Sequence, residues 1–150
     1  MREVNLGALT VSAQGGPWAL TLYQREFKES GKRYDWYSDY EEAFAEAEQA
    51  LKENPKINDT EYLSKIEPLF LLRTLWACAK NANEESIPSF EEWIKSLEIS
   101  MAPWAAWKWE VWLLIQAEIF RNPQIEAQAE VQEEKPDKRR TGRRKSTSGA

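Results

Sequence analysis

Adjacent carboxylates are the side chains of this sequence whose spacing could support acid–base chemistry. They occur as three pairs: Glu41-Glu42, Glu84-Glu85 and Glu91-Glu92. Neighbouring residues on a helix point in different directions, so we interpret these pairs as solvated faces and not as catalytic dyads. The sequence has no histidine, the commonest general base and metal ligand, and its single cysteine, Cys78, therefore has no histidine to activate it. These residues predict a protein that is not an enzyme and that holds no metal or cofactor.

The charged residues are unevenly distributed along the chain. Residues 1–123 carry 13 Lys and Arg against 20 Asp and Glu, whereas residues 124–150 carry 7 against 5. An acidic body repels phosphate, which argues against a nucleic-acid platform. Residues 124–150 contain no aromatic side chain and include a basic stretch at 135–145. This composition predicts a disordered charged tail, and a regulatory protein that contacts nucleic acid through that tail is the alternative to a protein-binding function.

The sequence also bears on where the protein works. No stretch approaches the roughly 20 apolar residues that cross a bilayer. Residues 1–14 lack the basic end and the long apolar run of a signal peptide. A lone cysteine fits a reducing compartment. We therefore expect a soluble cytoplasmic protein with no membrane partner.

Apolar residues at intervals of three and four predict a mainly α domain over residues 1–123. A short extended or β arm, of one or two strands, is expected over residues 4–12. About five helices should follow, over residues 18–28, 35–53, 62 or 68 to 81, 89–97 and 103–121. Ser89 and Glu92 form a capping box that should start the fourth helix.

The third of these helices is the most apolar and should be central. Its predicted buried stripe consists of Leu69, Leu72, Leu75, Trp76 and Ala79. Cys78 lies beside this stripe, where a small core residue is expected rather than a reactive thiol. We predict that Trp76 belongs to the core and not to a contact surface.

Four tryptophans in the fifth predicted helix are the candidate protein-binding residues: Trp104, Trp107, Trp109 and Trp112. At about 100° per residue they spread over roughly 200° of the helix, which is wider than one buried stripe. Either this helix is fully buried in the core, or part of its tryptophan surface awaits a partner. On the second interpretation, Trp109 and Trp112 are the contact pair, and Trp107 and Val111 face the core.

Three segments resemble the tail assembly chaperones of long-tailed bacteriophages of Gram-positive hosts. Residues 17–27 (PWALTLYQREF) resemble the opening helix of that family, with its Pro-aromatic-Ala start and Glu-Phe end. Residues 72–82 (LRTLWACAKNA) resemble its central Leu/Trp-Ala-x-Ala-Lys helix, and residues 88–94 (PSFEEWI) resemble its Pro-x-Phe-Glu-Glu-Trp-Leu segment. The order and the approximate spacing of the three segments also agree.

The resemblance implies a helical chaperone that is not part of the mature virion. Members of this family bind the tape measure protein, keep it soluble and recruit tail tube subunits. A longer, frameshifted form that shares the N-terminal domain is a frequent companion. The family offers no catalytic residues, so the resemblance implies protein partners alone.

Overall fold

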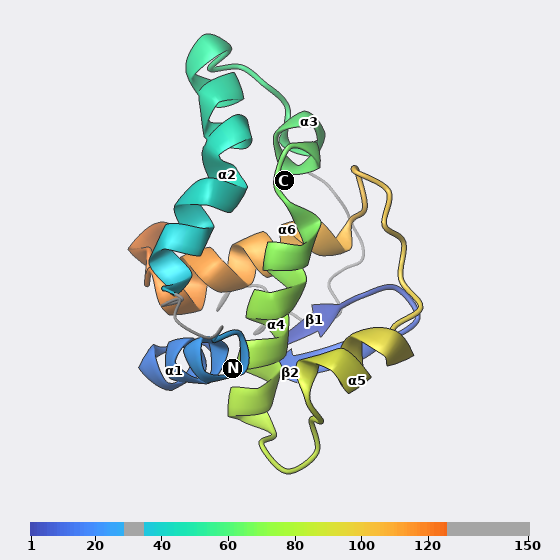
Figure 1. Ribbon diagram of the computed structural model, residues 1–150. Helices are drawn as coiled ribbons and strands as arrows, with labels where there is room; N and C mark the ends of the chain where they lie inside the picture. The colour runs from blue at the N-terminus through green and yellow to red at the C-terminus, as the bar shows by residue number, and fades with distance from the viewer. Residues whose placement is uncertain (29–34, 126–150) are drawn as a thin grey trace.

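The computed structural model describes residues 1–28 and 35–125. These residues are mainly helical, and a two-stranded antiparallel sheet forms their N-terminal end (Figure 1). The predicted fold class, mainly α with a short N-terminal arm, is therefore confirmed. The predicted disordered tail, residues 124–150, lies outside the described residues apart from 124 and 125.

The N-terminal arm is a β-hairpin made of β1 (Arg2–Asn5) and β2 (Thr10–Ala13). Val4 pairs with Val11, and both side chains are buried. The turn is closed by a hydrogen bond from the Leu6 amide to the Leu9 carbonyl oxygen (2.7 Å), and Gly7 in that turn has a φ of 104°. Such a positive φ favours glycine, which explains how so short a turn is made. The predicted arm is thus a pair of strands.

Helix α4 (Pro68–Ala82) runs through the middle of the molecule (Figure 1). Pro68 occupies its first turn, and the Glu67 carboxylate caps it by accepting from the amides of Leu69 (2.7 Å) and Phe70 (3.0 Å). Glu67 also forms an ion pair with Arg73 (3.6 Å). The third predicted helix therefore begins at the proline and not at Tyr62.

Trp76 is only 2% exposed, so its predicted place in the core is confirmed. Its indole donates to the Pro88 carbonyl oxygen (2.9 Å) and its ring packs against Phe27 and Phe90. The prediction was wrong for Leu69, which is 46% exposed although it was assigned to the same stripe. The Pro88–Phe90 segment covers Trp76, whereas Leu69 lies in the first turn of α4 and remains accessible.

Four further helices surround α4: α1 (Pro17–Glu26), α2 (Trp36–Glu53), α3 (Asp59–Ser64) and α5 (Phe90–Ser96). Figure 1 places α1 and α5 on either side of the lower half of α4, and α2 beside its upper half. The predicted cap of α5 is present, because the Ser89 hydroxyl accepts from the Glu92 amide (3.4 Å). The segment around Tyr62 forms the separate short helix α3.

Helix α6 (Trp107–Leu114) crosses α4 and continues as one turn of π-helix, η1 (Ile115–Ile119). The predicted start at Pro103 was wrong. A turn closed by the Ala105 amide and the Ala102 carbonyl oxygen (3.0 Å) occupies that position. The Trp107 indole donates to the Ser100 carbonyl oxygen (2.6 Å), which holds this loop folded back against the helix. The folded-back loop takes the place of a first helical turn.

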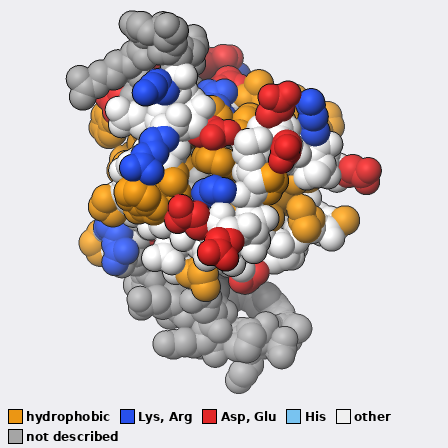
Figure 2. All heavy atoms as spheres, turned by 60° about the horizontal axis from the view of Figure 1, so that its bottom comes forward, with side chains coloured by type: hydrophobic (Ala, Val, Ile, Leu, Met, Phe, Trp, Pro, Cys, Tyr) orange, Lys and Arg blue, Asp and Glu red, His pale blue; other side chains and the backbone are white. Residues whose placement is uncertain are grey.

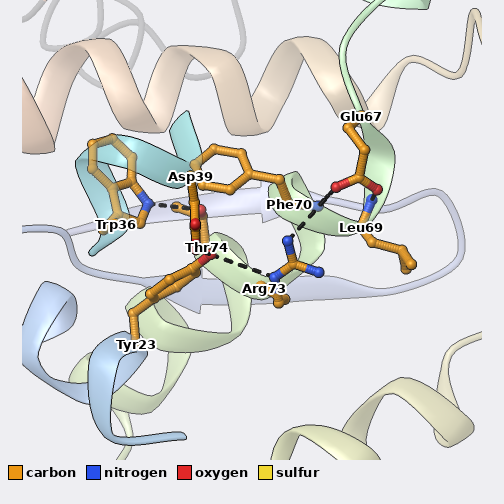
Figure 3. A network of polar contacts seen from close by, with 8 residues as sticks. All are labelled: Tyr23, Trp36, Asp39, Glu67, Leu69, Phe70, Arg73 and Thr74. Carbon is orange, nitrogen blue, oxygen red and sulfur yellow. Dashed lines mark hydrogen bonds and ion pairs between the residues drawn. The ribbon is translucent and has the colours of Figure 1, made fainter. Parts of the chain in front are cut away.

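A polar network joins α1, α2 and α4 (Figure 3). The Tyr23 hydroxyl donates to Asp39 Oδ2 (2.7 Å) and accepts from Arg73 Nε (3.4 Å). Beside it, the buried Trp36 indole donates to the Thr74 hydroxyl (2.9 Å). Burial of Tyr23 raises the pKa of its phenol, so the hydroxyl keeps its proton and remains a donor at neutral pH. The network fixes how the helices are placed relative to one another.

Candidate protein-binding groove

The structure separates the four candidate tryptophans into three environments. Trp107 is 3% exposed and Val111 is fully buried, so their predicted place in the core is confirmed. Trp107 is therefore inaccessible to a partner in this fold. Trp104 is 68% exposed, but it lies in the turn before α6 and not on the helix. Trp109 and Trp112 are half-buried and pack against the core with part of their surface accessible.

Trp109 and Trp112 form a stacked pair. Their ring centroids are 4.9 Å apart, and the ring planes differ by 10°. Stacking of this kind adds stability beyond area burial and holds both rings in one orientation. The pair thus holds two partly accessible aromatic rings in one fixed arrangement.

This pair lines one wall of a groove of about 290 Å³ between α2, α3 and α6. The other walls come from segments far apart in the sequence. The complete lining consists of Tyr40, Glu48, Leu51, Ile57, Asp59, Tyr62, Trp109, Trp112 and Gln116. Four aromatic residues and two aliphatic side chains make the surface mainly apolar, and two carboxylates are also part of the lining.

Hydrogen bonds hold the α3 wall of the groove in place. The Asn58 side chain accepts from the Glu61 amide (2.8 Å) and so caps α3. The Tyr62 hydroxyl donates to Glu48 Oε2 (2.6 Å) and thereby joins α3 to α2. Burial raises the pKa of the Tyr62 phenol, and the adjacent Glu48 carboxylate raises it further, so this donor stays protonated.

A buried lysine joins two of the helices that form the groove, and this role was not predicted from the sequence. Lys108 is 2% exposed, and its Nζ donates to the carbonyl oxygens of Leu63 (3.1 Å) and Ile66 (3.2 Å). These bonds join α6 to the end of α3. Burial lowers the pKa of the Lys108 amine. The sequence offers one signal for this role, a lone lysine flanked on both sides by tryptophan.

Other surfaces have a different character. A hollow of about 500 Å³ lies between the hairpin turn and residues 98–107, but its large aromatic residue, Trp107, is buried. Figure 2 turns the lower end of Figure 1 towards the viewer and shows acidic, basic and hydrophobic side chains interspersed over that face. A further hollow of about 460 Å³ combines Asp35 with aromatic residues, but its tryptophan, Trp36, is buried. The groove beside Trp109 differs from these hollows in its stacked pair of partly accessible tryptophans.

Within residues 1–28 and 35–125, no group of three or more Cys, His, Asp or Glu side chains could hold a metal ion. None of the helices in this part of the chain has the length and apolar character needed to cross a membrane. No protein-family model, curated protein or solved structure matches the chain.

Proposed function

We propose that this chain is a phage tail assembly chaperone that binds the tape measure protein in the host cytoplasm. It would keep that rod-shaped protein soluble and recruit tail tube subunits, without becoming part of the virion. The observation that carries the proposal is the groove lined by the stacked Trp109–Trp112 pair. A longer frameshifted form with the same domain would be a further partner.

The positions of the family-like segments support this proposal. Residues 17–27 form α1 and its cap, residues 72–82 lie in α4, and residues 88–94 lead into α5. The three segments meet in one aromatic cluster. The Phe27 ring lies 5.7 Å from the Trp76 ring and 5.0 Å from the Phe90 ring. The resemblance therefore concerns residues that build one core together.

The groove suits the physical problem that such a chaperone solves. A long helical rod with apolar stripes aggregates unless another surface covers those stripes. A groove of aromatic side chains binds one face of a helix in the manner of helix-in-groove recognition. Many copies bound along one rod would add avidity to weak individual contacts. An acidic body of 13 basic and 20 acidic residues would keep the covered rod in solution.

The test is co-expression with the tape measure protein, scored by the fraction of the rod that remains soluble. Loss of both groove tryptophans in Trp109→Ala/Trp112→Ala should cost about 2 kcal/mol or more in binding, roughly 30-fold in affinity. We expect the wild-type protein to keep the rod soluble and the double variant to fail while remaining folded by circular dichroism. Trp18→Ala, which removes a 43% exposed tryptophan of α1, is the matched control and should act like the wild type. A folded double variant that still solubilises the rod would exclude the groove as the binding face.

A further inference from the structure

We propose that the groove selects an amphipathic helix whose apolar stripe is flanked by Lys or Arg. This inference rests on the proposed function in taking a helical protein as the partner. It adds the chemistry that such a helix must carry to bind this site in preference to other apolar helices.

The dimensions of the groove favour side chains projecting from a helix. Its volume of about 290 Å³ lies just below the roughly 300–1,000 Å³ that small-molecule pockets occupy. It is bordered by side chains that remain accessible, among them Leu51, which is 37% exposed. Its aromatic walls come from three helices. Apolar residues spaced three and four apart on a partner helix would place one or two side chains in such a trough.

The charges at the groove decide the rest of the partner's chemistry. Glu48 and Asp59 are part of the lining, and none of the lining residues is basic. A purely apolar helix laid across them would take both carboxylates out of water without compensation, which is costly. An acidic helix would add repulsion between like charges. A partner with Lys or Arg beside its apolar stripe would instead form charge-assisted hydrogen bonds with the two carboxylates.

Two features of the lining match a guanidinium or an ammonium group in particular. Glu48 already accepts from the Tyr62 hydroxyl (2.6 Å), which holds its carboxylate in place. A carboxylate has lone pairs for several donors, so Glu48 can bind a partner cation as well. In the stacked Trp109–Trp112 pair, each indole also keeps one face that the other ring does not cover, and indole is the best aromatic surface for cation–π contact.

The test uses the full chain and three synthetic helical peptides of about 18 residues, or five turns. The first has a leucine stripe flanked by Lys and Arg, the second has the same stripe flanked by Glu, and the third has the composition of the first in a scrambled order. Fluorescence anisotropy measures the affinity of each. We expect the first peptide to bind about tenfold or more tighter than the other two. The Trp109→Ala/Trp112→Ala variant should lose roughly 30-fold in affinity for it.

The Glu48→Gln/Asp59→Asn variant isolates the charge, because both replacements keep the side-chain shape and the replacement at Glu48 keeps an oxygen acceptor for Tyr62. This variant should bind the basic peptide about tenfold more weakly than the wild type does. The ratio between its affinities for the basic and the acidic peptide should therefore be smaller than in the wild type. An unchanged preference, or equal affinity for both striped peptides in the wild type, would overturn the inference. The inference would also fail if replacing the seven basic residues of 135–145 by Ser tightened peptide binding about tenfold, because the tail would then be the occupant. Rod solubilisation is scored separately, so it can succeed or fail independently of these results.

Discussion

Replacement of Trp76 by alanine should destabilise the fold more than any substitution in the groove. The side chain is 2% exposed and sits between Phe27 and Phe90. A buried tryptophan covers about 150–250 Å², which at about 25 cal/mol per Å² corresponds to roughly 4–6 kcal/mol as an upper bound. The change also leaves the Pro88 carbonyl oxygen without its indole donor. We expect a loss of about 3–5 kcal/mol, the usual range for truncating a buried tryptophan.

Urea unfolding followed by circular dichroism measures this loss as a shift of the midpoint at constant slope. Trp76→Phe is the control, because phenylalanine keeps most of the ring and loses only the indole donor and some volume. Its expected cost is about 1–2 kcal/mol, dominated by the lost hydrogen bond. A cost below about 1 kcal/mol for the alanine variant would refute the assignment of this side chain to the core. Equal costs for both variants would refute the argument from buried area.

Three further predictions concern a buried lysine, a close contact of the backbone and a buried cysteine. Burial lowers the pKa of Lys108 below its ordinary 10.5, so the unfolded chain binds more protons than the folded chain as this group titrates. The unfolding free energy of the wild type relative to Lys108→Met should therefore rise as pH increases from about 7 towards 10.5. A difference in unfolding free energy that stays the same at every pH in urea titrations would contradict this prediction. Gly15→Ala should lower the unfolding free energy by about 1–3 kcal/mol, because a Cβ at this position would lie 2.8 Å from Glu118 Cβ. An unchanged urea midpoint would contradict this prediction and would show that η1 can move aside at little cost. Cys78 is fully buried and burial raises the pKa of its thiol, so a thiol reagent should label it only in denaturant; rapid labelling of the native protein would contradict the described packing.

The helices that could be predicted from the sequence are those with local signals. Pro68 favours a first turn and Ser89 favours a cap whatever lies around them, and both start helices in the structure. Pro103 carries the same local signal, but the hydrogen bond between Trp107 and Ser100 folds its segment into a loop. Leu69 has the spacing of a core residue, yet its side chain remains accessible in the first turn of α4. The structure of the Pro103 segment and the exposure of Leu69 are decided by tertiary contacts. The spacing of residues in the sequence carries no information on those contacts.

The groove could be predicted only in part. The angular positions of Trp109 and Trp112 on a helix placed them away from Trp107, and in the structure both are partly accessible whereas Trp107 is buried. The opposite wall could not be found in this way, because Ile57 and Tyr62 lie some 50 residues earlier and reach the groove through the packing of α3 on α2. The support from Lys108 was missed because lysines are seldom fully buried.

The late position of α6 in the chain affects how the protein folds during synthesis. Val111, Leu114 and Ile115 are fully buried in the same core as α4, yet α4 is complete at Ala82. At about 5–20 residues per second, roughly 2–7 s separate the translation of these two parts. During that interval the nascent chain exposes the apolar side of α4 that α6 later covers. A protein proposed to cover the apolar surface of a partner would thus expose apolar surface of its own during synthesis. Slower translation of the segment between α4 and α6 should increase aggregation of the nascent chain.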